Sequence, residues 1–402
     1  ETAASLNYLG ELYRRQGSLD EALPLIQRAL QIREKVLGAH HADLAATLTT
    51  LALYYQDRGE DAKALPLLER ALAIRERALG YNHPELAASL LNLGEYHRRW
   101  GAFQKALPWL EKARQICESS LGRLHPATAQ SLGSLGNLYA DMGFYSRAQT
   151  ALEQALQVRQ KSLGLEHPLA IQSLSDLGIL YIRQKEVDKA RPLLERALAI
   201  RERRWPAGHP EVAASYQDMA ILQQALGNWD SALSWGQKAL QIRESALGPE
   251  HPATLASLET SAAIHRQMGS PARAVPFLSR VLPVREKVLG AEHPDLLAFL
   301  ILLAQVTREA GQYDQSLALW QRTWTIRKKA LGEGHPETVA TLDNLAALAL
   351  DLGIYTKALS WAEQACQLRE KTLGPEHQAT AVSLGRLAAV QQAMGEYDLA
   401  LP

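Results

Sequence analysis

Histidine recurs in this sequence at a spacing that raises the question of a metal site. His-Pro occurs seven times at intervals of 42 residues, from His83 to His335, and His41 and His377 extend the series without the proline. A zinc site needs several ligands that converge on one point, whereas each period supplies one histidine. Proline is favoured at the first position of a helix, where its missing N–H costs nothing. We therefore expect these histidines to mark helix starts, and we expect no metal site.

Arginine forms a second periodic set, in which Cys117 takes the place of arginine in one period. The arginines are Arg33, Arg75, Arg159, Arg201, Arg243, Arg285, Arg327 and Arg369. A phosphate-binding stripe is one interpretation, but it would need a basic excess. Glutamate directly follows six of these arginines, and Lys+Arg and Asp+Glu number 43 each. The set therefore predicts ion pairs and backbone contacts between periods, and the balance argues against nucleic acid as the main partner.

The sequence contains no recognisable catalytic motif. It has no nucleophile elbow, no phosphate-binding loop and no zinc-protease motif. Of the two cysteines, Cys366 falls among small and apolar residues, which indicates a buried thiol rather than a nucleophile. We therefore expect neither an enzyme nor a cofactor. Two widely separated cysteines fit a reducing, cytoplasmic location, and the absence of a run of 18 apolar residues argues against a membrane span.

Each period contains two helical patterns. In the first, Leu90, Leu93 and His97 share one face with the small residue Gly94, which would let a second helix approach closely. The second pattern ends at Leu-Gly. A recurring glycine separates the two patterns and tolerates the positive φ of a helix end; it stands at positions 17, 59, 101, 143, 227, 269, 311, 353 and 395. Neither helix buries its apolar face alone, so neighbouring pairs must stack.

The regular period predicts an all-α fold, a right-handed superhelical solenoid of antiparallel helix pairs. It extends over residues 1–402 as a single array of nine full 42-residue periods and a partial one. One period departs from the pattern, with Lys185 in place of the turn glycine and Trp205-Pro206 in place of Leu-Gly. We expect a less regular structure there. Because the sequence begins and ends inside helical patterns, we expect it to be a fragment of a longer protein.

The motif Leu-x-x-Leu-Gly-x-x-Tyr followed by Ala-x-x-x-Leu-x-x-Ala resembles the tetratricopeptide repeat. The 42-residue period with Arg-Glu-Lys-x-Leu-Gly, as at 33–38 and 285–290, is similar to kinesin light chains and to arrays in bacterial signalling proteins. The light-chain motif Asn-Asn-Leu-Ala is only partly present, so the kinesin cargo role is not carried over. The resemblance implies a protein-protein interaction scaffold. The alternative is a sensor or regulatory arm of a larger bacterial signalling ATPase or caspase-like protease.

The candidate binding surface is the side of each first helix opposite its buried face. Three isoleucines, Ile179, Ile182 and Ile221, occupy positions there that ordinarily face water. An apolar centre with a polar rim is typical of a peptide-anchoring pocket. We therefore expect a concave groove that binds a protein or peptide, and packing of the isoleucines between neighbouring helices is the equal alternative.

Polar residues complete the predicted groove. They are Glu95, Arg98, Arg99, Asn137, Arg183, Gln217 and Gln224. Asn137 is expected to bind the backbone of the partner, the charged residues to set its charge preference, and the two glutamines to close one side. Self-association through the uncapped ends of the solenoid is a further expectation, whereas neither nucleic acid nor membrane is expected as a partner.

Overall fold

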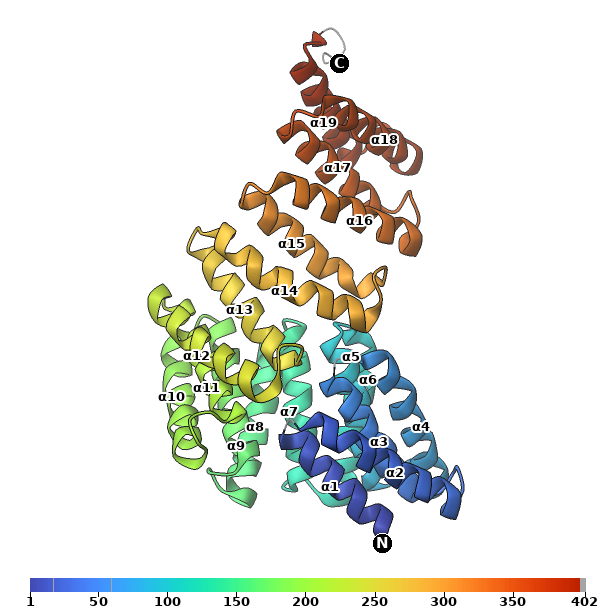
Figure 1. The fold of residues 1–402 in the computed structure, drawn as a ribbon, viewed down its shortest axis with the longest axis vertical. Helices are drawn as coiled ribbons and strands as arrows, with labels where there is room; N and C mark the ends of the chain where they lie inside the picture. Colours follow the sequence, from blue (N-terminus) through green and yellow to red (C-terminus); the bar gives the residue numbers. More distant parts are fainter. Residues whose placement is uncertain (17, 59, 398–402) are drawn as a thin grey trace. The chain divides into compact units, whose positions relative to one another are not determined.

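The computed structural model describes residues 1–16, 18–58 and 60–397, and all regular elements in that part of the chain are helices (Figure 1). The predicted all-α class is therefore confirmed. The predicted turn glycines Gly17 and Gly59 lie outside the described residues. The right-handed superhelix stays a prediction.

Each period begins with one helix, which we call helix A. These helices are α1 (Thr2–Gln16), α3 (Ala42–Asp57), α5 (Pro84–Arg99), α7 (Pro126–Asp141), α9 (Pro168–Arg183), α11 (Pro210–Ala225), α13 (Pro252–Gln267), α15 (Leu297–Glu309), α17 (Pro336–Asp351) and α19 (Gln378–Met394). A 3-10 turn, η1 (Pro294–Leu296), precedes α15.

The second helix of each period, helix B, is longer. These helices are α2 (Leu19–Leu37), α4 (Asp61–Leu79), α6 (Phe103–Leu121), α8 (Tyr145–Leu163), α10 (Val187–Arg204), α12 (Trp229–Leu247), α14 (Pro271–Leu289), α16 (Tyr313–Leu331) and α18 (Tyr355–Leu373). Most of them have 19 residues, whereas most A helices have 16.

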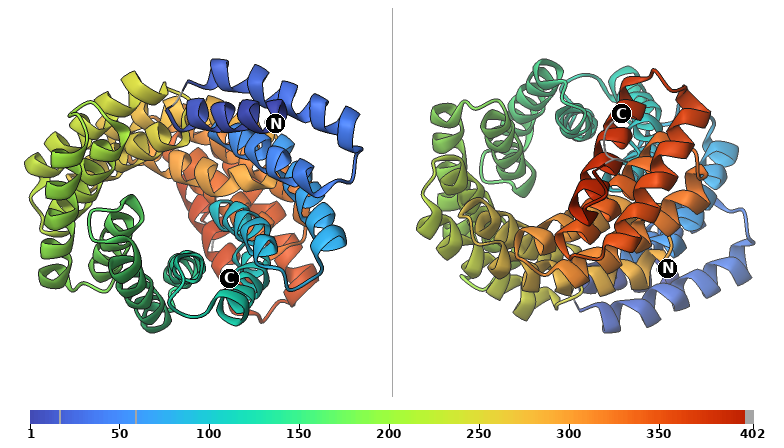
Figure 2. Two further views of the ribbon diagram at one scale, coloured as in Figure 1. Left: turned by 90° about the horizontal axis from the view of Figure 1, so that it is seen from below. Right: turned by 90° about the horizontal axis from the view of Figure 1, so that it is seen from above.

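The chain divides into two compact units, residues 1–260 and residues 261–402, and the boundary falls inside α13. In unit 1, from α1 to α12, each helix A packs against the helix B of its own pair, and each helix B before α12 packs against the next helix A, as in α5, α6 and α7. Figure 2 shows the helix pairs of unit 1 along a curve, with α9 on the inner side and α10 on the outer side. Unit 2 repeats the same pairing from α15 to α19.

The small residue of helix A permits this close packing, as the sequence predicts. A Cβ atom added to Gly136 would lie 2.6 Å from Cγ of Leu152 on the partner helix, and one added to Gly178 would lie 2.5 Å from Cδ2 of Leu194. Both leucines are 1% exposed. A side chain at these positions would push the two helices of a pair apart.

The two departures from the repeat pattern, at Lys185 and at Trp205-Pro206, affect the backbone differently. Lys185 adopts a φ of +64°, and its N–H donates to the carbonyl of Ile182 at 2.9 Å, as Gly143 donates to Ala140 at 3.2 Å. The expected irregularity is therefore absent from this turn, because the lysine takes up the glycine conformation. At Trp205 the chain does change, since this residue is extended where other B helices end in a glycine of positive φ, and α10 has 18 residues.

Candidate functional site

The periodic histidines cap the A helices. In each of the nine, Nδ1 accepts the backbone N–H of the residue two positions further on, at 3.1–3.3 Å. This arrangement satisfies one of the N–H groups that a helix start leaves without a partner. The predicted role of the histidines in starting helices is confirmed. Within the described residues, no group of three or more His, Cys, Asp or Glu side chains could hold a metal ion.

The periodic arginines join neighbouring pairs, and we call this set the arginine ladder. Seven of them donate to a Ser or Thr hydroxyl 14 residues further on, in the next helix A; the pairs are Arg33–Thr47, Arg75–Ser89, Arg159–Ser173, Arg201–Ser215, Arg243–Ser257, Arg327–Thr341 and Arg369–Ser383. Arg285 instead lies over the ring of Phe299, with its guanidinium carbon 4.6 Å from the ring centroid. Contacts between periods are therefore confirmed, although the prediction named ion pairs and backbone contacts and most of these arginines also bind a hydroxyl. Backbone carbonyls accept from Arg33, Arg159, Arg243 and Arg327, and Arg201, Arg327 and Arg369 form ion pairs.

Cys117 occupies the position of the ladder arginine in its period. This thiol is fully buried, and Ser131, which would otherwise accept from an arginine, donates to the carbonyl of Thr128 at 2.8 Å. Burial raises the pKa of the Cys117 thiol. Cys366 is also buried and free, and burial raises its pKa too. A raised pKa disfavours the reactive thiolate, which agrees with the predicted structural role of Cys366.

Two carboxylates, Asp176 of α9 and Asp218 of α11, lie beside the middle of the ladder, and the predicted site did not include them. Burial raises the pKa of Asp218 to about 6, although a hydrogen bond with Ser175 and the charge of Arg201 act in the opposite direction. Burial also raises the pKa of Asp176, against hydrogen bonds from Gln172 and Asn137. The sequence carried one signal for them, since each stands three residues before an isoleucine of the predicted groove.

A second set of inter-pair contacts runs along the C-terminal ends of the A helices, and we call it the ion-pair rail. An arginine of one helix A pairs with a carboxylate 43 residues further on in the next; the pairs are Arg14–Asp57, Arg98–Asp141, Arg266–Glu309 and Arg308–Asp351. In the last three pairs the nitrogen and oxygen atoms lie 2.6 Å apart. Each pair therefore neutralises two charges at the C-terminal ends of neighbouring A helices.

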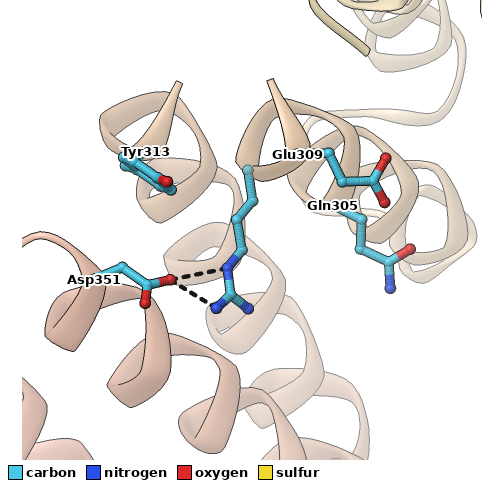
Figure 3. A pocket seen from close by; sticks show the side chains of 5 residues that line it. Gln305, Glu309, Tyr313 and Asp351 are labelled. Atoms are coloured by element: carbon cyan, nitrogen blue, oxygen red, sulfur yellow. Dashed lines mark hydrogen bonds and ion pairs between the residues drawn. The ribbon is translucent and has the colours of Figure 1, made fainter. Parts of the chain in front are cut away.

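The part of the rail in unit 2 borders a polar depression. A cavity of about 540 Å³ is lined by Gln305, Arg308, Glu309, Tyr313 and Asp351. Figure 3 shows Asp351 and Tyr313 on one side of it, with Gln305 and Glu309 on the neighbouring helix. The side chains of Arg308 and Asp351 are 42% and 37% exposed, so this depression is charged and open to water.

The rail is interrupted at more than one step: Gln56 and Arg99 occupy its positions between α3 and α5, and a longer interruption lies between α7 and α11. Ala140 and Ile182 stand where the rail has arginine, and Ala225 stands where it has a carboxylate. Arg183 donates back to Asp141 at 2.8 Å, so Asp141 pairs with both Arg98 and Arg183. We call the stretch from Ala140 to Ala225 the rail gap, because the rail positions 140, 182 and 225 carry no charged residue.

The three predicted isoleucines border the rail gap. Ile179, Ile182 and Ile221 are each half-buried. Ile179 and Ile182 also pack against a buried cluster that includes Leu180 and Met219. Their side chains thus contribute to the core and still present apolar surface. The predicted binding pocket stays a prediction.

The predicted polar residues are less free than the sequence suggested. Glu95 pairs with Arg98 at 2.8 Å, which in turn pairs with Asp141. Asn137 is half-buried and hydrogen-bonded to Asp176. Arg99 and Arg183 are exposed, and Gln224 is half-buried. Only Arg99 among the predicted charged residues has no ion pair within the described residues.

Gln217 is positioned by the ladder. It is 9% exposed, and its Oε1 accepts from Ser257 at 3.1 Å and from Arg243 at 3.4 Å. Its Nε2 donates to Thr260. Its amide is therefore occupied by side chains of neighbouring helices and is not free for a ligand.

None of the helices in the described part of the chain is both long and apolar enough to cross a membrane. The fold and its two sets of inter-pair contacts define a helical-repeat solenoid. The chain belongs to the tetratricopeptide repeat family. The family model matches residues 1–77, 51–119, 101–161, 127–203, 211–287, 256–319, 295–371 and 341–402.

Solved structures resemble the chain to different extents. The nearly identical TPR-like repeats of a putative kinesin light chain from Podosopora anserina are 30% identical, with 52% of this chain and 98% of that chain covered and a TM-score of 0.42. BtubC from P. vanneervenii is 23% identical, with coverages of 58% and 91% and a TM-score of 0.43. A Rap protein complexed with competence and sporulation factor is 15% identical, with coverages of 98% and 99% and a TM-score of 0.55, which supports the fold alone. The search among curated proteins found no match.

Proposed function

We propose that this chain is a protein-interaction scaffold that binds a short peptide segment of its partner at the rail gap. The observation that carries the proposal is the position of Ile179, Ile182 and Ile221, half-exposed where the ion-pair rail is interrupted. Membership of the tetratricopeptide repeat family supports an interaction role. The proposal assigns no catalytic step and no cofactor to the chain.

An apolar anchor of the partner would supply most of the affinity. Burying one leucine-sized side chain over the isoleucines contributes about 1.5–3 kcal/mol, which corresponds to roughly ten- to a hundredfold in affinity. A leucine, isoleucine or methionine side chain fits this role, because the surface at the gap is aliphatic.

The polar rim would act mainly on the rate and salt dependence of association. Arg98 and Arg183 share Asp141, and Arg98 also pairs with Glu95, so the charges of these four residues balance at this edge of the gap. Exposed Arg99 adds a further positive charge on α5, and Gln224 supplies an amide on α11. Asn137, already hydrogen-bonded to Asp176, has one remaining N–H for the backbone of the partner. We assign no contact to Gln217.

The test introduces a new ion pair of the rail type at the rail gap by mutation. Residues 182 and 225 are 43 positions apart, as in every rail pair, so Ile182→Arg combined with Ala225→Asp introduces a rail pair at the gap. Peptide ligands are first selected from a displayed random library against the whole chain. Their affinities for the original chain and for the double variant are then compared by fluorescence anisotropy. We expect the double variant to remain folded and to bind about tenfold more weakly or worse.

A charge-swapped rail pair provides the matched control. Arg308→Asp with Asp351→Arg exchanges the partners of an existing pair in unit 2 and should leave affinity unchanged. Because Ile182 also contacts the core, Ile221→Asn provides a second, single change at the gap. Selected peptides that bind both gap variants as tightly as the original chain would exclude the gap as the site.

A further inference from the structure

Ion pairs also connect neighbouring B helices. Arg70 lies 2.8 Å from Glu34, and Lys112 lies 3.6 Å from Glu76. In unit 2, Arg322 pairs with Glu286. In each case the basic residue stands 36 positions after its carboxylate, so the same two helix positions form a bridge between successive B helices.

The bridge is missing between α6 and α8, because Gln154 occupies the basic position. The corresponding carboxylate, Glu118, pairs with Arg114 of its own helix at 2.8 Å. Two cavities of about 340 Å³ and 450 Å³ lie at this step, and Arg114, Glu118, Leu132 and Gln154 line both of them. They therefore form one continuous groove between the two B helices, which we call the outer groove.

The outer groove has the length of a short peptide. Its lining residues on α8 extend from Ser146 to Val158, which is about 18 Å along a helix. An extended segment of about five or six residues spans that distance. Thr150 and Gln154 are exposed on one wall and offer hydrogen bonds, while Leu132 forms part of the apolar floor.

The charge of the outer groove is unbalanced. Arg114, Arg123 and Arg147 line it, and Glu118 is the single carboxylate among the lining residues of the two cavities. Arg147 lies over the ring of Phe144, with 5.7 Å between its guanidinium carbon and the ring centroid. Within the described residues, neither Arg123 nor Arg147 has a carboxylate partner, and both are exposed. Guanidinium groups without partners favour carboxylates of a ligand.

We infer that the outer groove is a second docking surface, which binds an extended acidic peptide segment of a partner protein. Carboxylates of the segment pair with Arg147 near the start of α8 and with Arg123 toward its end. An apolar side chain between them covers Leu132 and Leu135. This inference is independent of the proposed function, because it concerns different side chains and a different ligand chemistry.

The probe for the test is a fluorescein-labelled hexapeptide, Glu-Leu-Glu-Glu-Leu-Glu, titrated with the full chain at low salt. The same peptide with lysine in place of glutamate controls for charge. We expect saturable binding of the acidic peptide alone, and roughly tenfold weaker binding after Arg123→Glu or Arg147→Glu. Absence of saturable binding, or affinities unchanged by both reversals, would overturn the inference.

The variant Gln154→Arg distinguishes binding of the peptide in the outer groove from non-specific electrostatic attraction to a basic surface. It introduces a basic residue at the position where Arg70 pairs with Glu34 and Lys112 pairs with Glu76 in the two preceding steps. The chain should therefore fold normally. The new arginine adds a positive charge, yet it closes the groove by pairing with Glu118. If the acidic peptide binds in the outer groove, its affinity for this variant must fall. If it is held only by general electrostatic attraction, its affinity must rise. Unchanged or tighter binding would refute the inference, and the rail-gap variant should leave affinity for this probe unchanged.

Discussion

Lys185 shows how far a single residue can depart from the repeat without altering its backbone. Its φ of +64° lies close to the values of the corresponding glycines, such as +70° at Gly101 and +80° at Gly143. For a residue with a Cβ atom, this left-handed conformation costs roughly 1 kcal/mol. The hydrogen bonds of the turn and the packing of α9 on α10 hold the residue there.

Lys185→Gly should therefore stabilise the protein. Relief of the left-handed strain is partly offset by the greater freedom of glycine in the unfolded chain, so we expect a gain of about 0.5–1 kcal/mol. The measurement is the midpoint of urea unfolding, followed by circular dichroism. The reverse change, Gly143→Lys, places the same strain in the preceding turn and should lower the midpoint; equal midpoints for all three proteins would show that the strain is negligible.

At the scale of the helices, the ladder arginines stabilise the array by hydrogen bonds that connect neighbouring helices, in addition to their charge. Arg201 is 1% exposed and donates to Ser175 and Ser215 at 2.9 Å each and to Gln172 at 3.2 Å. One guanidinium therefore connects α10 with both α9 and α11. Removing it leaves the buried hydroxyls of Ser175 and Ser215 without this donor, which is costly because they are shielded from water.

We expect Arg201→Leu to lower the free energy of unfolding by about 3–5 kcal/mol. Leucine fills part of the volume, so most of the loss comes from the unsatisfied polar groups. The matched change Arg33→Leu affects a half-buried ladder residue at the first step of the array and should cost less. Urea unfolding of both variants gives the comparison, and equal losses would contradict the role of burial.

Sequence periodicity predicted the helices well because their boundaries depend on local residues. His-Pro starts and positive-φ glycines act within a few positions of themselves, so α5 and α7 begin and end where the pattern indicates. The rail and the burial of Asp176 and Asp218 depend on side chains of neighbouring pairs. Gln217 illustrates the limit, since residues from two other helices convert an expected groove residue into an interior one.

At the scale of unit 1, side chains from distant periods share one electrostatic environment. Burial lowers the pKa of His251 to about 4, with further lowering by Arg243 and by Arg99 of α5, which lies far earlier in the chain. The Nδ1 atom of His251 accepts the N–H of Ala253 at 3.1 Å, which requires its lone pair. The cap at α13 therefore depends on the neutral form of this histidine.

Acidification should weaken the folded state through His251. Its pKa in the folded state lies below the ordinary value of about 6.5, so its contribution is complete above pH 6.5 and declines as the pH falls toward 4. The loss amounts to at most about 3 kcal/mol. Asp218, whose pKa is raised to about 6, acts in the opposite direction over the same range.

The comparison of the original chain with His251→Asn isolates the histidine, because asparagine caps a helix without titrating. Urea midpoints at pH 7.5 and 4.5 should fall more for the original chain than for the variant. His83→Asn replaces a capping histidine that lies away from Arg243. Its urea midpoints give the effect on stability of exchanging a histidine cap for an asparagine cap. Parallel declines in the original chain and His251→Asn would exclude a contribution from His251.

The constant separation of 43 residues within the ion-pair rail gives the repeats a fixed order, although their backbones are alike. Deleting residues 267–308, which is one period of 42, would bring Asp351 to the place of Glu309, and Arg266 would keep an acidic neighbour. Deleting residues 99–140 would bring Arg183 to the place of Asp141, opposite Arg98. Two periods of equal length and shape are therefore not equally dispensable. Recombination between repeats can shorten this array without charge conflict only at certain junctions, and those junctions can be read from the residues 43 positions apart.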